Sequence, residues 1–123
     1  MDQARDIVQN SDLTLLTMQL TVKDISAAKA MIRALKEHGV HGDRVMPLIN
    51  RYYKRRAMIS LDEAKKALGV VDIRCIDNDF KSAIKALNYG QPVSEAAPRS
   101  ALHRDMKKLA TEVFQARKAI AFA

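Results

Sequence analysis

The sequence predicts an α/β fold with a three-stranded parallel sheet, crossover helices and a long C-terminal helix. Short apolar runs alternate with segments whose apolar residues recur at helical spacing, and glycines or prolines separate the two. Such alternation favours parallel strands joined by right-handed crossovers. At 123 residues the chain has the length of one domain, so we expect residues 1–123 to form a single domain.

The composition indicates an ordinary globular protein with an aliphatic interior. Hydrophobic residues make up 48% of the chain and charged residues 28%, while tryptophan is absent. The net charge of +7 favours acidic partners such as nucleic acid, anionic lipid or nucleotide phosphates, and its sign does not choose among them. No apolar run approaches the roughly 20 residues of a membrane span, and no signal region opens the sequence. The cytoplasm is the expected location.

The first predicted strand runs from Leu13 to Leu20 and carries polar residues, Gln19 and Thr21, at its end. A helix follows, with Asp24 as its expected cap and Gly39 as its stop. The apolar residues at helical spacing are Ile25, Ala28, Met31, Ile32 and Leu35.

The second predicted strand, Val45–Ile49, ends abruptly in Asn50 and Arg51. A short helix follows a basic loop, because Ser60 and Glu63 have the spacing of a capping box. This helix should lie against the sheet as a crossover.

The third predicted strand, Val70–Ile76, ends in Asp77, Asn78 and Asp79. A predicted helix follows and ends at Gly90. Its apolar residues at helical spacing are Phe80, Ala83, Ile84 and Leu87.

The last element, residues 100–121, is predicted to be a long amphipathic helix, with Ser100 as its cap. A linker carrying Pro92 and Pro98 precedes it. The apolar face of this helix could pack on the sheet of the same chain, on a partner helix or on an anionic membrane surface, and we favour the sheet. This apolar face consists of Leu102, Met106, Leu109, Val113, Ala116 and Ile120.

Four short segments together resemble the carboxyl-terminal half of MinD/ParA-type P-loop ATPases, and most closely the CpaE/TadZ branch that localises the Flp/Tad pilus assembly machinery. The resemblance runs from about residue 11 to residue 109. The segments are Ser11–Thr21, Leu48–Tyr52, Ile76–Phe80, and Asn88–Pro92 followed by Ala97–Ser100.

The resemblance implies a partial Rossmann-like, P-loop NTPase-like fold and an adenine-binding role for Asn50, Arg51, Asn78 and Asp79. In that family the asparagine ending the second of these strands recognises the adenine ring, and Asn50 matches it. An amide offers one donor and one acceptor to an adenine edge, and open α/β sheets bind ligands beyond this edge. The sequence departs from the family at Asp77, where proline is usual, which adds a carboxylate near the base.

A phosphate-binding loop is missing from the sequence, whose glycines stand at positions 39, 42, 69 and 90. The chain by itself should therefore not hydrolyse ATP, and we assign no catalytic residue. ATP or ADP is expected only together with a P-loop-bearing partner or N-terminal half, and this chain alone should bind no metal. We expect a fragment or a shortened relative of a longer ATPase, whose first strand presents an apolar edge that must pair with something.

A basic patch follows the second strand and has two interpretations. It could be a solvated loop, or it could track a phosphate backbone while Tyr52 and Tyr53 stack on bases. We favour the solvated loop. The patch consists of Arg51, Lys54, Arg55 and Arg56.

Other reactive residues suggest no site. His38 and His41 lack acidic or thiol partners at a ligand spacing, so a metal site is not predicted. Cys75 lies in an apolar strand without an activating histidine motif, so we interpret it as a structural residue.

The leading functional hypothesis is a noncatalytic portion of a CpaE/TadZ-like pilus localisation ATPase that carries the adenine side of a nucleotide site. The alternatives are a basic ParA-like module that binds DNA nonspecifically and a purely structural oligomerisation domain. Self-association is the favoured interaction, followed by pilus assembly proteins, with DNA or an anionic membrane less favoured. Besides the cytoplasm, peripheral attachment at the inner membrane or the cell pole is the alternative location.

Overall fold

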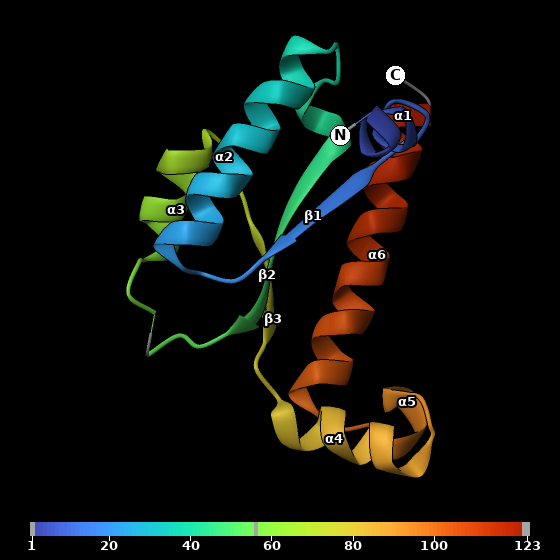
Figure 1. Ribbon diagram of the computed structural model, residues 1–123. Coiled ribbons are helices and arrows are strands. Elements are labelled where there is room, and N and C mark those ends of the chain that lie inside the picture. Colours follow the sequence, from blue (N-terminus) through green and yellow to red (C-terminus); the bar gives the residue numbers. More distant parts are fainter. Residues whose placement is uncertain (1, 56, 122–123) are drawn as a thin grey trace.

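A computed structural model describes residues 2–55 and 57–121 and shows a three-stranded parallel sheet between two layers of helices (Figure 1). The predicted α/β class, the parallel sheet and the long last helix are confirmed. Helices α2 and α3 cover one face of the sheet and α6 covers part of the other (Figure 1). The elements are α1 (Asp2–Gln9), β1 (Thr14–Met18), α2 (Val22–Glu37), η1 (Gly42–Arg44), β2 (Val45–Tyr52), α3 (Leu61–Leu68), β3 (Arg74–Asp77), α4 (Phe80–Tyr89), α5 (Val93–Ala96) and α6 (Ala101–Ala121).

The strands lie in the order β1-β2-β3, so the second strand is central and the other two are the outer strands. Thr14 lies opposite Val45 and Met18 opposite Ile49, in parallel register. Between β2 and β3 the register is also parallel, with Tyr52 opposite Asp77. The carboxyl ends of all three strands therefore meet at one edge of the sheet, as predicted.

Two apolar clusters fill the space on either side of the sheet. The first packs α2 and α3 on the sheet around Ile49, whose exposed fraction is 0%. The second packs α6 on the other face, around Met46, Leu48, Ile76 and Leu109. Burial on both faces is typical of a central parallel strand and explains the continuous apolar sequence of β2.

The last helix packs with most of its apolar stripe on the sheet. Leu102, Leu109, Val113 and Ala116 all belong to the second cluster, which supports the favoured interpretation of this helix, whereas Met106 is exposed. In the described residues, no helix combines the length and the hydropathy that crossing a bilayer requires.

The third strand begins later than the sequence indicated. The prediction of a strand from Val70 is wrong, because β3 starts at Arg74. Gly69 ends α3 in the left-handed conformation, and the chain then leaves the core, so that Val71 is 96% exposed. The prediction took the apolar residues after Gly69 as the start of a strand, but Val71 contacts water rather than the sheet.

Several helix ends also differ from the prediction. The cap of α2 is Thr21, whose hydroxyl accepts from the backbone N–H of Asp24, while the Asp24 carboxylate accepts from the N–H of Gln19. The capping box of Ser60 and Glu63 is confirmed, with both reciprocal hydrogen bonds formed. Two short helices, α1 and α5, were not predicted.

Candidate functional site

The end of β2 is irregular, and this decides where its polar side chains lie. The pairing with β3 shifts between Ile49 and Tyr52, and Arg51 has a φ of 51°. A positive φ is uncommon for a residue with a β-carbon and marks a bulge-like kink in the strand. The strand continues to Tyr52, so the basic segment does not begin as a loop at Arg51. Asn50 and Arg51 are both exposed.

A groove of about 490 Å³ lies at the carboxyl ends of β2 and β3, where the sequence predicted a site. Of the predicted residues, Lys54, Arg55, Asn78 and Asp79 line it, whereas Asn50 and Arg51 do not. Arg56 lies outside the described residues. The lining residues are Tyr52, Tyr53, Lys54, Arg55, Asp77, Asn78, Asp79 and Ala101.

Asn78 is held by the β2 side of this groove. Its side-chain amide donates a hydrogen bond to the hydroxyl of Tyr53, and its backbone N–H donates to the carbonyl of Tyr52 at 3.1 Å. The amide oxygen of Asn78 has no hydrogen bond within the described residues. The groove thus offers phenol rings, an amide and two cations, together with the carboxylates of Asp77 and Asp79, which suits a planar polar ring.

The carboxylate of Asp79 accepts hydrogen bonds from two helices, α4 and α6. It accepts from the N–H of Ser82 at 3.3 Å, as the cap of α4, and from the N–H of Leu102 at 3.2 Å in the first turn of α6. The side-chain hydroxyl of Ser82 is the main reason that the pKa of Asp79 is lowered from its ordinary value, with further contributions from the backbone N–H groups of Leu102 and Ser82. Both carboxylate oxygens therefore have structural partners.

Asp77, the acidic residue that departs from the family pattern, is hydrogen-bonded to α6. Its backbone N–H donates to Asp105 at 2.9 Å, and its carboxylate accepts from Arg104 at 3.2 Å. Arg104 also bonds Asp105, and the two carboxylates raise the pKa of this guanidinium. The extra carboxylate is therefore paired with a cation at the rim of the groove.

Two weakly acidic groups near the groove stay protonated at neutral pH. Burial is the main reason that the pKa of Tyr52 is raised, with smaller contributions from Cys75 and Asp77. Burial and the neighbouring charge of Asp77 raise the pKa of the Cys75 thiol to about 11. A thiol with this pKa is a poor nucleophile at pH 7, which supports a structural role for Cys75.

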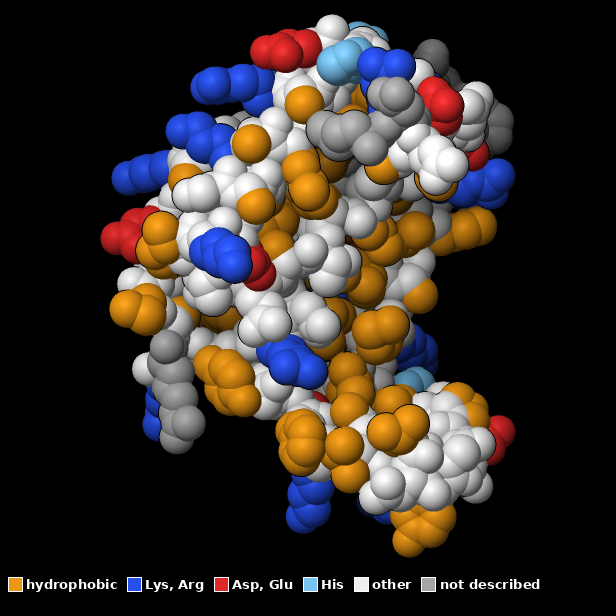
Figure 2. Space-filling model, in the orientation of Figure 1, with side chains coloured by type: hydrophobic (Ala, Val, Ile, Leu, Met, Phe, Trp, Pro, Cys, Tyr) orange, Lys and Arg blue, Asp and Glu red, His pale blue; other side chains and the backbone are white. Residues whose placement is uncertain are grey.

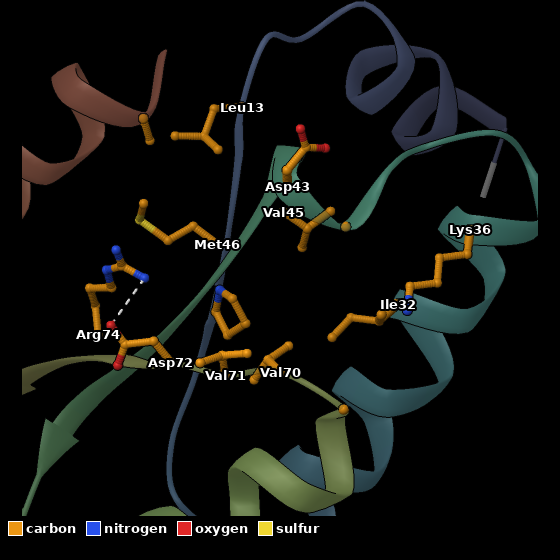
Figure 3. A pocket seen from close by; sticks show the side chains of 14 residues that line it. Leu13, Ile32, Lys36, Asp43, Val45, Met46, Val70, Val71, Asp72 and Arg74 are labelled. Atoms are coloured by element: carbon orange, nitrogen blue, oxygen red, sulfur yellow. Dashed lines mark ion pairs between the residues drawn. The ribbon is translucent and has the colours of Figure 1, made fainter. Parts of the chain in front are cut away.

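A second cavity, of about 380 Å³, lies at the opposite edge, beside the amino ends of the strands (Figure 3). Leu13, Val45 and Met46 line it at the amino ends of β1 and β2, and Ile32 lines it from α2 (Figure 3). Its charged lining includes Arg74, which forms an ion pair with Asp72 at 3.6 Å. Lys36 and Asp43 also line this cavity, but its walls are mainly apolar and it lies away from the carboxyl ends of the strands, so the groove remains the candidate site.

Metal binding finds no support in the described residues, which contain no group of three histidine, cysteine or acidic side chains able to hold an ion. His38 instead ends α2, where its ring lies 2.7 Å from the carbonyl of Ala34.

The first turns of α6 complete the rim of the groove, and sequence reasoning missed this. Ala101 lines the groove, and Arg104 and Asp105 hold the end of β3. The one available signal was Asp105, a carboxylate in the helix that packs on an apolar sheet. A carboxylate on such a helix needs a donor nearby.

The chain is similar in structure to the ParA family ATPase from Chlorobium tepidum TLS, known from a crystal structure, with a TM-score of 0.74 and 22% sequence identity. The likeness covers 85% of this chain and 43% of that chain. No protein-family model matches the sequence, and no curated protein does. At this identity the comparison establishes the fold: the chain has a ParA/MinD-like α/β architecture and spans less than half the length of the ATPase that it resembles.

Proposed function

We propose that this chain is a noncatalytic portion of a CpaE/TadZ-like localisation ATPase and contributes the adenine side of a nucleotide site. The observation that carries the proposal is the groove at the carboxyl ends of β2 and β3, in a ParA/MinD-like sheet. This is where open α/β sheets hold ligands.

The groove is suited to a purine in its chemistry. Tyr52 and Tyr53 line the groove with aromatic rings that would stack on a base. Asn78 supplies an amide whose oxygen accepts no hydrogen bond within the described residues and would accept one from an exocyclic amine. Asn50 stands just outside on the kinked end of β2, from which it would contact a base bound beyond the strand ends. Lys54 and Arg55 would neutralise part of the charge of a nucleotide.

In this proposal ATP is hydrolysed by a P-loop-bearing half and not by this chain alone. The sequence lacks a glycine-rich loop with a following lysine and Ser/Thr, so it supplies neither a phosphate cradle nor a magnesium ligand of that type. Nucleotide binding would require a P-loop-bearing half, which would place the phosphates while this chain contacts the base.

The test is a titration of ATP and ADP against the chain alone and against the chain joined to a P-loop half. We expect the joined protein to bind nucleotide, and Asn50→Ala and Asn78→Ala each to weaken its affinity by about 3- to 10-fold, the value of one or two hydrogen bonds. Asn88→Ala, an exposed asparagine of α4, is the matched control. Unchanged affinity in both site variants would refute the assignment.

A second function, nonspecific DNA binding, is favoured by one observation. Lys54 and Arg55 are exposed beside Tyr52 and Tyr53, an arrangement that can follow a phosphate backbone while the rings stack on bases. Binding of this kind should weaken steeply as salt is added. Lack of binding to a DNA duplex and to single-stranded DNA at low salt would exclude it.

A further inference from the structure

The side chain of Asn78 is held at one end. Its amide nitrogen donates a hydrogen bond to the hydroxyl of Tyr53, the residue that directly follows β2. Its backbone N–H donates to the carbonyl of Tyr52, so main chain and side chain both tie Asn78 to the end of β2. In a planar amide the oxygen lies on the other side from the nitrogen. The oxygen of Asn78 is therefore turned away from Tyr53, and it accepts no hydrogen bond within residues 2–55 and 57–121.

The carboxylates on either side of Asn78 already have donors. Asp79 accepts from two backbone N–H groups at the starts of α4 and α6, and Asp77 accepts from Arg104. Without these donors the two carboxylates would compete for the amide N–H of Asn78, because hydrogen bonds to ionised groups are the stronger ones. Tyr53 thus keeps the amide nitrogen, and the acceptor end of the amide is left for a ligand.

The groove around this amide has room for a base. Its volume of about 490 Å³ lies within the usual range of small-molecule sites, and the rings of Tyr52 and Tyr53 line it. Figure 2 shows the surface indented between the side that carries α3 and the lobe formed by α4 and α5. An acceptor beside aromatic rings suits a base with an exocyclic amine, since such a base can stack on a ring and donate in its own plane.

We propose that Tyr53 is a positioning residue that fixes the amide of Asn78 with its oxygen toward the ligand, so that the site selects 6-aminopurines over 6-oxopurines. Adenine carries an amine at this position and can donate to the oxygen. Hypoxanthine and guanine carry a carbonyl there, which would face the oxygen of Asn78 as a second acceptor. The inference rests on the proposed nucleotide site and adds which purines that site accepts and which residue decides it.

Asn50 differs from Asn78 in this respect. Its side chain is exposed on β2 just before the kink, and in the described part of the chain no hydrogen bond fixes its amide. An amide that rotates can offer either a donor or an acceptor to a base. Asn50 would therefore add affinity for any purine, whereas Asn78 would discriminate between them.

The first experiment tests the orientation of the amide in the full chain without nucleotide. In NMR spectra the side-chain NH₂ of Asn78 should exchange with solvent about 3- to 10-fold more slowly in the parent than in Tyr53→Phe, because phenylalanine offers no acceptor. Tyr89→Phe, at an exposed tyrosine of α4, is the matched control and should leave this exchange unchanged. Equal exchange in the parent and in Tyr53→Phe would overturn the proposal, because Tyr53 would then not hold the amide.

The second experiment measures selection in the chain joined to a P-loop half, by titration with ATP and with inosine triphosphate, whose base has a carbonyl in place of the amine. We expect ATP to bind about 10-fold more tightly, the value of a hydrogen bond together with the unfavourable contact of two acceptors. Tyr53→Phe should lower this ratio to about threefold or less, because the released amide can turn its NH₂ toward the carbonyl. Tyr89→Phe should leave the ratio unchanged. Lys54 and Arg55 are present in all these proteins, so their attraction for the carbonyl cancels in the comparison.

A third variant separates positioning from a merely structural role of Tyr53. Asn78→Asp presents an acceptor in either rotation, since both ends of a carboxylate are oxygens. Its charge weakens both nucleotides, so the ratio of the two affinities is the readout. The preference for ATP should persist in Asn78→Asp, and adding Tyr53→Phe should no longer change it. An equal effect of Tyr53→Phe in both backgrounds would mean that the tyrosine acts through the shape of the groove, which would overturn the proposal.

The remaining outcomes separate this inference from the proposed function. Equal binding of the two nucleotides by the joined parent protein, or tighter binding of inosine triphosphate, would refute the selection alone. Failure to bind either nucleotide would refute the nucleotide site and the selection with it, while the NMR comparison would still show whether Tyr53 holds the amide of Asn78.

Discussion

The two outer strands of the sheet have free edges that differ in chemistry. At β3, carboxylates of Asp72 and Asp105 accept from the backbone N–H groups of Ile73 and Asp77, and α6 is fastened beside the strand by Arg74–Glu112 at 2.7 Å. At β1 the sequence is uncharged and no such side-chain bond is formed within the described residues. Acidic side chains on a strand edge protect it from pairing, whereas an uncharged apolar edge promotes pairing.

One outer edge of this sheet is thus bonded by side chains of the chain itself, and within the described residues the other is not. The bonded edge also adjoins the candidate groove, because Asp77 lines the groove and is held by Arg104 and Asp105 of α6.

The largest expected contrast between the edges is in side-chain burial. Ile76→Ala in β3 should lower the free energy of unfolding by about 2–5 kcal/mol, because Ile76 is 3% exposed and its removal leaves a cavity under α6. Leu15→Ala in β1 should cost less than about 1 kcal/mol in the monomer, since this side chain is already partly in water. Urea unfolding at low protein concentration measures both. Equal losses would mean that β1 is covered in solution, even at the lowest concentration.

The next contrast concerns the carboxylate that closes the β3 edge. Asp105→Ala should cost about 1–3 kcal/mol, because it leaves the N–H of Asp77 without its acceptor in a half-buried position, and the Asp105 side chain is 14% exposed. Asp105→Asn keeps an acceptor and should cost less. Asp43→Ala, at an exposed position in η1, is the control.

Hydrogen exchange gives a local measure of the same variant. The amide of Asp77 should exchange faster in Asp105→Ala than in the parent chain, while amides of β1 should be unchanged. Uniform acceleration across the sheet would show that the carboxylate stabilises the whole fold and not the edge.

Local signals in the sequence were sufficient for much of this architecture. The continuous apolar run of β2 and the capping box of Ser60 and Glu63 act between residues close in the chain, and both were predicted correctly. The parallel order followed from the alternation of strands and helices. The late start of β3 was missed, because two valines after a helix-ending glycine are typical of a strand, although Val70 packs on the α3 side of the core and Val71 faces water.

The sequence indicated that polar residues gather at the carboxyl edge of the sheet, where the groove lies. It did not indicate which of these residues line the groove. Asp105 and Asp77, which are hydrogen-bonded, lie 28 positions apart in the sequence, and Asp79 and Leu102 lie 23 apart. The periodicity of apolar residues does not predict contacts between residues so far apart in the chain. The kink at Arg51 has no sequence signal either, since arginine is not a residue that favours a positive φ. These are the features that separate Asn78 and Asp79, which line the groove, from Asn50 and Arg51, which do not.

The smallest contrast concerns Asp79, which holds α4 and α6 together just beyond the end of β3. Asp79→Ala should lower the free energy of unfolding by about 0.5–2 kcal/mol, the usual value of a helix cap, and Asp79→Asn, which can still accept, by less. The lowered pKa of this carboxyl in the folded chain fixes the pH dependence. Its contribution is complete above the ordinary value of 3.8 and is lost as the pH falls through the lower folded value, because the unfolded chain binds the proton first. The difference between parent and Asp79→Asn, measured by urea unfolding, should therefore shrink from pH 7 to pH 3. A difference that stays constant would mean that the carboxylate charge plays no part, and that Asp79 joins α4 to α6 through hydrogen bonds that a neutral acceptor can also form.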